Sequence, residues 1–247
     1  MEEMLMDAIK IEGLTKKYRD IVAVDSLSLS VKEGELFSLL GVNGAGKTTT
    51  IKMLSCLTEP TEGDAYLLGK SIRREASEVK SIIAVSPQET AIAPGLTSRE
   101  NLELICGVHS FSKDKREKKI RELTELLGLG SVLHRKAGKL SGGWQRRLSI
   151  AMSLISEPKI LFLDEPTLGL DVIARSDLWD IIRSLKGKIT IILTTHYMEE
   201  AEALSNRIAI MRDGKLLICD TSENIKNIAE TESFEEAFIR IVKGVKE

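Results

Sequence analysis

The stretch LFSLLGVNGAGKTT, residues 36–49, decides the fold of this chain. Its first part, Leu36 to Leu40, is a short, largely apolar run of the kind found in strands that are buried on both faces. Residues 49–57 are compatible with a helix. The loop between them satisfies the pattern G-x-x-x-x-G-K-[ST] with Gly41, Gly46, Lys47 and Thr48. A strand, this loop and a helix in that order predict a phosphate-binding loop.

The predicted loop indicates how the phosphates of ATP would be bound. Glycines allow a tight turn whose backbone N–H groups face the α- and β-phosphates, and the positive end of the following helix adds to the attraction. Lys47 is expected to neutralise β- and γ-phosphate charge, and the hydroxyl of Thr48 to bind Mg²⁺. The expected ATP contacts here are Gly41, Val42, Asn43, Gly44, Ala45, Gly46, Lys47, Thr48 and Thr49. A plain glycine-rich turn is the alternative, and the flanking strand and helix argue against it.

Further apolar runs predict more buried strands, at residues 82–85, 160–163 and 189–193. Helical patterns lie between such runs, as at residues 77–80 and 172–185. Strands that alternate with helices predict an α/β fold whose core is a parallel sheet covered on both faces. Residues 23–31 and 65–68 add two strand candidates, which predict an N-terminal antiparallel β region.

The segment from about 91 to 156 is rich in helix formers and predicts an α-helical lobe inserted into the sheet core. Its charged run, Lys113 to Lys119, carries opposite charges at helical spacing and is interpreted as a solvated helix face. We expect a single domain over residues 1–247, with the sheet core at about 9–90 and 157–221. In the tail, about 222–247, an amphipathic stretch at 230–242 predicts one more surface helix.

The composition narrows the classes of function. Lys and Arg number 35 against 37 Asp and Glu, a formal net charge of −2, so no basic field favours nucleic acid and none is expected as a partner. Cys56, Cys106 and Cys219 are far apart and lack metal-like spacing, which is typical of small buried residues in a reducing compartment. No apolar run reaches the roughly 18 residues of a membrane span. We therefore expect a cytosolic chain that reaches a membrane only through a partner.

Two adjacent carboxylates follow the predicted strand at residues 160–163. Side chains alternate across a strand, so Asp164 and Glu165 can serve different tasks at the carboxyl edge of the sheet, where ligands of α/β proteins bind. We assign Asp164 to Mg²⁺ and Glu165 to polarising the attacking water. The alternative is a pair of exposed acids in a turn before Pro166, and the phosphate-binding loop elsewhere in the chain makes it the weaker reading.

The residues Leu140-Ser141-Gly142-Gly143-Trp144 open another predicted helix, which stops near Pro158. Ser141 is a natural N-cap residue, and the two glycines leave the first N–H groups unobstructed. A bare helix start of this kind can bind an anion. An ordinary capped helix is the alternative, and these three residues alone would favour it.

Taken together, these motifs resemble those of the nucleotide-binding subunits of ABC transporters, with their P-loop nucleoside triphosphatase core. The resemblance runs from Ile9 to about Asp220. In the order of the chain, the similar motifs are the Walker A loop at 41–48, the Q-loop glutamine Gln88, the signature at 140–143, the Walker B strand at 160–165, the D-loop at 168–171 and the switch histidine His196. Tyr18 stands where the family stacks an aromatic ring on adenine.

The resemblance implies a mechanism that one chain alone does not suggest. Two subunits, identical or close homologues, would face head to tail, so that Ser141, Gly142 and Gly143 of one close over the γ-phosphate held by the other. Gln88 is implied as a contact to Mg²⁺ and water and as a hinge to the helical lobe. His196 is implied to hold the γ-phosphate and to orient the water toward Glu165. The signature departs from the family at its fifth position, where Trp144 replaces the usual glutamine.

The expected function is therefore that of an ATP-hydrolysing motor subunit, with ATP and Mg²⁺ as cofactors, peripheral on the cytoplasmic face of a membrane. Its partners would be transmembrane permease subunits. Export is the expected direction, because the signature, the D-loop and the segment from Thr194 to Glu200 resemble efflux subunits. One alternative is a soluble ABC-type ATPase with a non-transport partner. Another is a nucleotide kinase, which would explain the Walker A loop but not the signature or His196.

Overall fold

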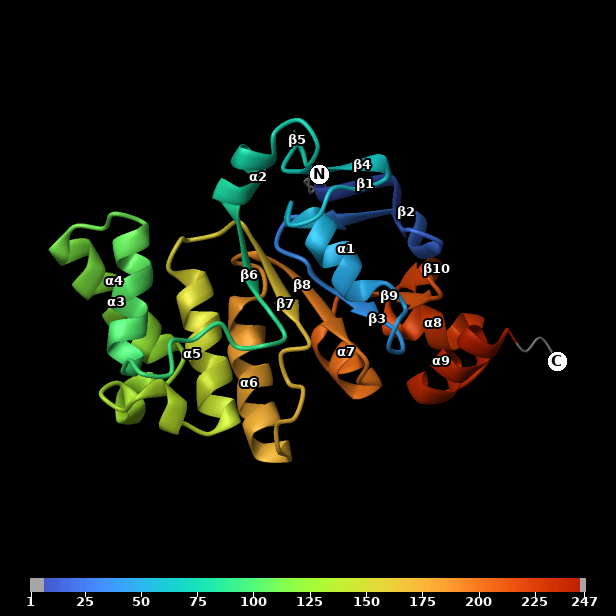
Figure 1. The fold of residues 1–247 in the computed structure, drawn as a ribbon. Helices are drawn as coiled ribbons and strands as arrows, with labels where there is room; N and C mark the ends of the chain where they lie inside the picture. The colour runs from blue at the N-terminus through green and yellow to red at the C-terminus, as the bar shows by residue number, and fades with distance from the viewer. Residues whose placement is uncertain (1–6, 245–247) are drawn as a thin grey trace, which may run out of the picture.

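A six-stranded sheet forms the centre of the computed structural model, which describes residues 7–244 (Figure 1). Its strand order is β10-β9-β3-β8-β7-β6. The strands are β3 (Leu36–Leu40), β6 (Ile83–Ser86), β7 (Ile160–Asp164), β8 (Thr190–Thr195), β9 (Arg207–Arg212) and β10 (Lys215–Asp220). All neighbouring pairs are parallel except β9 and β10. The predicted α/β fold with a parallel-sheet core is confirmed.

A second, antiparallel sheet lies beside the first and has the order β2-β1-β4-β5. It consists of β1 (Asp7–Tyr18), β2 (Ile21–Lys32), β4 (Glu62–Leu67) and β5 (Lys70–Ser71), and α2 (Ala76–Ile82) follows it. This is the antiparallel region expected near the N-terminus. The sequence patterns indicated β2 and β4, whereas the two-residue strand β5 is too short to show a period.

Helix α1 (Lys47–Leu54) packs between the two sheets, as the ribbon shows. Ile51 and Met53 of this helix share one buried cluster with Val24 of β2 and Phe162 of β7. The opposite face of the six-stranded sheet is covered by α6 (Val172–Leu185) and by α5 (Gly142–Leu154). Both faces are therefore buried, which explains why β3, β7 and β8 have no exposed residue.

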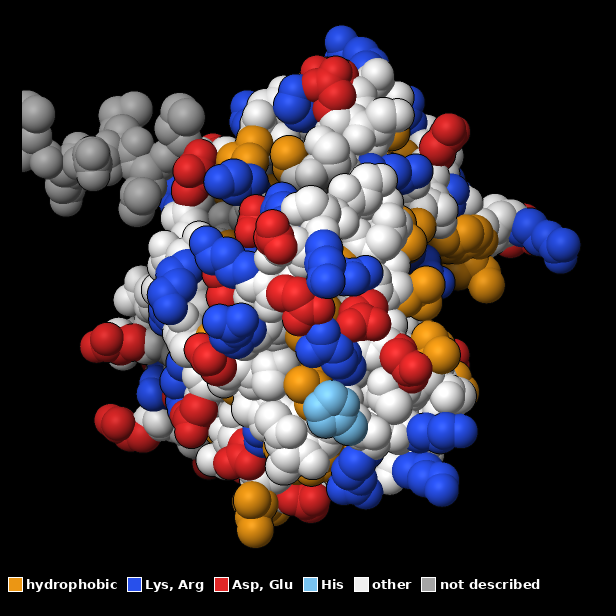
Figure 2. Space-filling model, turned by 90° about the vertical axis from the view of Figure 1, so that its left-hand side faces the viewer, with side chains coloured by type: hydrophobic (Ala, Val, Ile, Leu, Met, Phe, Trp, Pro, Cys, Tyr) orange, Lys and Arg blue, Asp and Glu red, His pale blue; other side chains and the backbone are white. Residues whose placement is uncertain are grey.

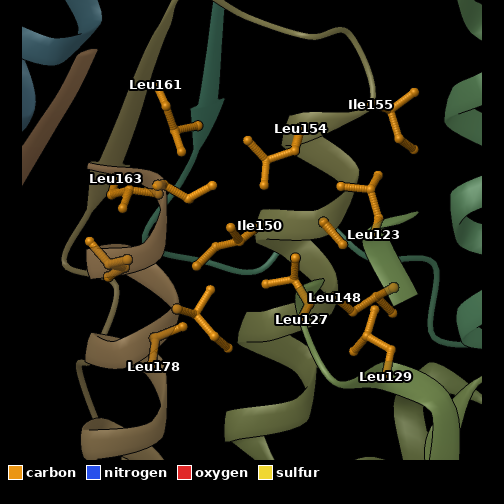
Figure 3. Close-up of a cluster of buried hydrophobic side chains, with 14 of the residues drawn as sticks. Leu123, Leu127, Leu129, Leu148, Ile150, Leu154, Ile155, Leu161, Leu163 and Leu178 are labelled. Atoms are coloured by element: carbon orange, nitrogen blue, oxygen red, sulfur yellow. The ribbon is translucent and has the colours of Figure 1, made fainter. Parts of the chain in front are cut away.

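The helical lobe is built from α3 (Ser98–Val108), α4 (Lys113–Leu126), two short 3₁₀ turns at 129–132 and 137–139, and α5. A capping box at Thr97 and Glu100 starts α3. Figure 3 shows how the lobe joins the core: Leu123 and Leu129 meet Leu148 of α5, and the same cluster continues to Leu161 of β7. The lobe and the sheet thus share one apolar core.

The charged run in α4 lies on the outer side of the lobe, where basic and acidic side chains are interspersed (Figure 2). Lys119 pairs with Glu157 at 2.8 Å, and Arg99 of α3 pairs with Glu117 at 2.6 Å. Most of the run is exposed or partly exposed, in agreement with a solvated helix face.

The tail differs from its prediction. Two helices are present in place of one, α8 (Ser222–Ile228) and α9 (Phe234–Lys243), because Thr221 and Ser233 each cap a separate helix start. The tail is also more than surface, since Phe234 and Phe238 are buried against Leu40 and residues of β9. Helix α7 (Met198–Leu204), which comes before β9 in the chain, also packs against α9.

Two expectations about composition can be compared with the structure. Within residues 7–244, no helix is long and apolar enough to cross a membrane. Of the three cysteines, Cys106 is buried, whereas Cys56 and Cys219 are only partly buried. The expectation of buried cysteines is therefore wrong for two of them, because Cys56 lies in the turn after α1 and Cys219 lies on the edge strand β10.

Candidate nucleotide site

The loop between β3 and α1 needs glycine at two positions for different reasons. A Cβ atom on Gly41 would lie 2.4 Å from the carbonyl oxygen of Met211, so no larger residue fits there. Gly46 has φ +99°, a conformation open to glycine, and a Cβ atom there would also meet the carbonyl oxygen of Ala23 at 2.5 Å. Main-chain oxygens of β9 and β2 therefore lie against the loop on two sides and leave no room for a side chain at either glycine.

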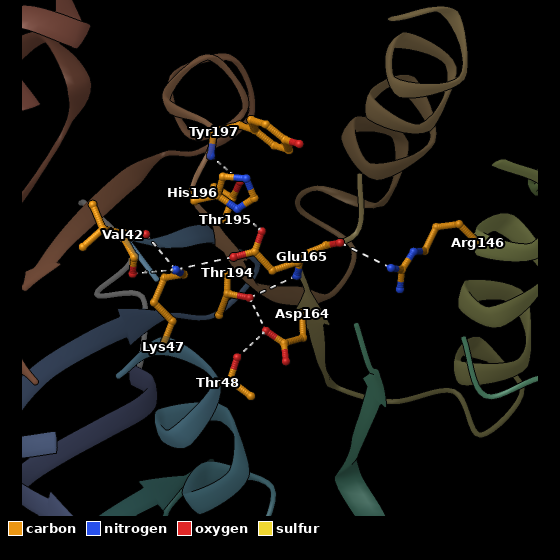
Figure 4. A network of polar contacts seen from close by, with 11 residues as sticks. Val42, Lys47, Thr48, Arg146, Asp164, Glu165, Thr194, Thr195, His196 and Tyr197 are labelled. Carbon is orange, nitrogen blue, oxygen red and sulfur yellow. Dashed lines mark hydrogen bonds and ion pairs between the residues drawn. The ribbon is translucent and has the colours of Figure 1, made fainter. Parts of the chain in front are cut away.

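Lys47 begins α1 with its side chain turned back over the loop (Figure 4). Its ammonium group donates to the carbonyl oxygens of Gly41 at 2.7 Å and Val42 at 3.3 Å. It also lies 3.4 Å from a carboxylate oxygen of Glu165. A buried cation is thus held at the mouth of the loop by two dipoles and one charge.

Thr48 and Asp164 meet at the end of β7, as the sequence predicted for two ligands of one metal ion. The hydroxyl of Thr48 donates to Asp164 Oδ1 at 3.2 Å, and the hydroxyl of Thr194 donates to the same oxygen at 2.5 Å. Thr194 was not among the predicted site residues. Only the pairing of β7 with β8, which places Asp164 opposite Thr194, brings it here.

Glu165 connects three parts of the site. Its carboxylate lies 3.4 Å from Lys47 and 2.6 Å from Nδ1 of His196. Its backbone N–H donates to the carbonyl oxygen of Thr194 at 3.1 Å and to that residue's hydroxyl at the same distance. Its φ of +49° is uncommon for a residue with a side chain, so these contacts hold the backbone in a less favourable conformation.

These residues surround a cleft of about 570 Å³, large enough for a small ligand. Predicted residues that line it are Tyr18, Asn43, Gly44, Ala45, Gly46, Lys47, Thr48, Thr49, Gln88, Glu165 and His196. Ile21, Val22, Ala23, Leu168 and Asp213 line it too and were not predicted. Ile21 and Val22 are exposed apolar residues next to Tyr18, a signal that the sequence alone does not separate from an ordinary β-turn.

The signature residues do not reach this cleft. Ser141 and Gly143 line a separate hollow of about 270 Å³, together with Trp144 and Arg147. Ser141 occupies the N-cap position of α5, but its side chain makes no capping hydrogen bond. Gln145 instead donates to two carbonyl oxygens before the helix. The prediction that Ser141 is the N-cap residue of this helix is confirmed, and because its hydroxyl makes no capping bond, the hydroxyl remains at the open end of the helix.

Two further buried charged groups near the site were not predicted. Arg146 on α5 donates to main-chain carbonyls beside the site, and Glu200 on α7 accepts a hydrogen bond from the indole N–H of Trp179 at 3.1 Å. Burial raises the pKa of the Glu200 carboxyl, and the nearby Glu165 carboxylate adds to this rise. In the sequence each of the two residues stands next to a residue of the same charge, so the sequence pattern does not indicate that either is buried.

A parallel sheet with a glycine loop between β3 and α1, and an acidic pair at the end of β7, two strands away from β3, defines a P-loop nucleoside triphosphatase. The family model described as "ABC transporter" matches residues 24–168. The chain belongs to the ABC transporter family, and its fold is that of the family's ATPase cassettes.

Individual relatives place the chain more closely. It is 40% identical over 221 residues to the daunorubicin/doxorubicin resistance ATP-binding protein DrrA of Streptomyces peucetius, covering 89% of this chain and 67% of that protein. It is also 40% identical over 228 residues to the phospholipid-transporting ATPase ABCA3 of Homo sapiens, with 91% of this chain but only 13% of that protein covered. The chain therefore spans a small part of the human relative.

Among solved structures, the chain resembles a dimeric, post-hydrolysis state of the ATP-binding cassette MJ0796 bound to ADP and Pi. The TM-score is 0.77 at 29% sequence identity, and the match covers 86% of this chain and 98% of that chain.

Proposed function

We propose that this chain binds ATP in the cleft at the end of β3, hydrolyses it, and acts as the motor subunit of an exporter whose permease is a separate chain. One observation carries the proposal. The tertiary fold brings Lys47, Thr48, Glu165 and His196, which come from three distant segments, to one cleft. The set comprises a cation for the phosphates, a hydroxyl for Mg²⁺, a base for the attacking water and a ring that orients the base, which suits phosphoryl transfer to water.

The phosphate-binding part of the proposal follows from what Lys47 does without a nucleotide. Its ammonium group is held by loop carbonyls and by Glu165. The β- and γ-phosphates carry more negative charge than these partners, so binding of ATP would draw Lys47 toward them. The contact between Lys47 and the carboxylate of Glu165 would then be lost.

The oxygen donors beside the loop fit Mg²⁺. Among residues 7–244, no group of three or more His, Cys, Asp or Glu side chains could hold a metal ion, which agrees with an ion bound mainly by phosphates and water. Thr48, Asp164 and Gln88 would supply its protein ligands. When bound, Mg²⁺ neutralises charge on the triphosphate.

Glu165 is proposed to take the proton of the attacking water. His196 lies 2.6 Å from Oε2 of its carboxylate, whereas Lys47 faces Oε1, so the two residues orient the group through different oxygens (Figure 4). The backbone bonds of Glu165 to Thr194 keep the carboxylate in place. Preorganised polar groups of this kind lower the barrier without moving during the reaction.

A second ATP-binding subunit, identical or closely related, is part of the proposal. Ser141, Gly142 and Gly143 are too far from the cleft of their own chain to line it, and the hydroxyl of Ser141 makes no capping bond. A head-to-tail partner would place them over the γ-phosphate. The dimeric cassette bound to ADP and Pi supports the presence of a second ATP-binding subunit.

The permease and the direction of transport rest on the relatives. One is a daunorubicin/doxorubicin resistance protein and another a phospholipid-transporting ATPase, and resistance to a drug supports export as the direction. We propose that the chain works on the cytoplasmic face of a membrane, bound to transmembrane permease subunits.

The ATPase part is tested with Glu165→Gln, which removes the base but keeps the phosphate loop and Asp164. We expect turnover to fall by at least about 100-fold, with ATP affinity retained. Lys47→Ala should weaken nucleotide binding itself. Hydrolysis at the parental rate in Glu165→Gln would show that another group is the base.

The transport part is tested by purifying the tagged chain from detergent-solubilised membranes of cells that also express the candidate permease. We expect a multi-span protein to co-purify in stoichiometric amount. Recovery of the chain alone, under conditions where the permease is present and folded, would count against a transport role.

A further inference from the structure

The guanidinium group of Arg146 lies where three segments of the site meet, and Figure 4 shows its contact with Glu165. Arg146 is on α5 and is only 4% exposed. It donates to the carbonyl oxygens of Pro87 and Gln88, both at 2.6 Å, and to that of Glu165 at 3.3 Å. One side chain therefore connects the signature helix with the segments that leave β6 and β7.

The partners of Arg146 are main-chain carbonyls, which is an unusual choice for a buried charge. Burial lowers the pKa of the guanidinium, while the carboxylates of Asp164 and Glu200 oppose this effect, and the group stays protonated at neutral pH. A planar fork can donate to carbonyls of two separate segments at once, whereas the ammonium of a lysine is a single point. The contact thus depends on arginine in particular.

The segments that Arg146 joins belong to the reaction. Gln88 lines the nucleotide cleft and leads into the helical lobe. The peptide of Glu165 is held by Thr194 at its N–H and by Arg146 at its carbonyl oxygen. Because φ of Glu165 is +49°, the backbone would relax if either contact were lost.

The geometry points to Arg146 as a positioning residue for hydrolysis. It keeps the main chain of Gln88 and Glu165 in one arrangement, so that a movement of the helical lobe would change the position of the base Glu165. Arg146 does not line the cleft and acts only through the other two residues. This inference rests on the proposed ATPase function.

The test compares Arg146→Lys and Arg146→Met with the parent chain and with Arg73→Lys. Arg73 also donates to two main-chain carbonyls, those of Pro60 at 2.8 Å and Thr61 at 3.1 Å, but lies outside the cleft. For both Arg146 variants we expect kcat to fall about 10- to 100-fold while the Kd for a fluorescent ATP analogue changes less than about threefold. Arg73→Lys should keep the parental kcat.

A second readout does not depend on activity. Amide hydrogen exchange measured without nucleotide should become faster at residues 88–92 in the Arg146 variants, with the exchange of α1 unchanged. The Arg73 variant should leave residues 88–92 unaffected.

The outcomes separate the two proposals. A kcat for Arg146→Lys within about twofold of the parent overturns the inference. So does a joint loss of ATP binding and cooperative thermal unfolding in Arg146→Lys, since that describes a purely structural residue. If the parent hydrolyses no ATP, only the proposed function is contradicted. Unchanged amide exchange at residues 88–92 in the Arg146 variants would show independently that Arg146 does not hold this segment.

Discussion

At the scale of single residues, the site is held in place by contacts to the main chain as much as by side-chain pairs. Lys47 is bound by loop carbonyls, and the base Glu165 is held through both its backbone N–H and its backbone carbonyl oxygen. Main-chain contacts are insensitive to the identity of the residue that accepts them. The arrangement therefore depends on the side chains that donate to the main chain, Lys47 and Arg146, more than on the residues whose carbonyls accept.

Tyr18 gives the first prediction at this scale. It ends β1, is 44% exposed and lines the cleft, with the ammonium of Lys16 5.0 Å from its ring. If the ring stacks on adenine, Tyr18→Ala should weaken ATP binding by about 1–3 kcal/mol, whereas Tyr18→Phe and Tyr18→Trp should retain it. Titration with a fluorescent ATP analogue measures the affinities. Equal affinity of the Ala and Trp variants would remove Tyr18 from the site.

Glu200 gives a prediction about pH. Its carboxyl is fully buried, and burial raises its pKa above the ordinary value of 4.5, with Glu165 acting in the same direction. The folded chain therefore holds this proton more tightly than the unfolded chain. The stability that this contributes is present below pH 4.5 and is lost as the pH rises through the folded pKa.

Glu200→Gln carries no such proton, so its free energy of unfolding relative to the parent should increase as the pH rises from 4.5 toward neutral. Urea denaturation of both proteins at several pH values measures the difference. Glu199→Gln, at an exposed neighbouring position, is the matched control and should show little change. A difference that is flat or falls with pH would contradict the buried, proton-holding carboxyl.

At the scale of elements, α9 shows how a helix that looks peripheral takes part in the core. Its buried face packs against β9 and belongs to the same apolar cluster as Leu40, which ends β3 directly before the phosphate loop. The amphipathic pattern predicted the helix, but no local pattern states what covers its apolar face.

We expect Phe238→Ala to lower the free energy of unfolding by about 3 kcal/mol, because the side chain is 8% exposed and its removal leaves a cavity. Ile239→Ala, at the next position and 40% exposed, should cost well under about 1 kcal/mol. Chemical denaturation of the two variants measures both. Equal losses would mean that α9 does not pack as described.

At the scale of the whole molecule, the cleft and the signature helix face different surroundings, so one chain holds only part of the proposed active site. Trp144 stands beside Ser141 and Gly143, and the guanidinium of Arg147 lies 4.8 Å from its ring. If ATP closes two chains on each other, the surroundings of Trp144 must change.

In a Glu165→Gln background, where ATP should persist, we expect Mg-ATP to shift tryptophan emission in a concentration-dependent way, because association is bimolecular. The shift should survive Trp179→Phe and largely vanish with Trp144→Phe. Sedimentation at the same protein concentrations follows dimer formation independently. An ATP-dependent dimer with unchanged Trp144 emission would place the signature helix away from the closing interface.

Much of the fold could be read from the chain itself. The apolar run at 36–40, the glycines at 41 and 46, and the periodic helix at 172–185 each reflect a local requirement: burial on both faces, a tight turn or one apolar helix face. Such requirements act within a few residues, so the sequence alone determined the P-loop core, and the family resemblance extended it to the motifs of an ABC cassette.

The tertiary structure alone decided which distant residues meet. Thr194 reaches Asp164 because β7 pairs with β8, and Arg146 reaches Glu165 because α5 packs against that edge of the sheet. The burial of Glu200 likewise follows from the packing around α7. Strand order and helix packing are properties of the assembled chain, and a local pattern carries no information about a contact between residues that are far apart in sequence.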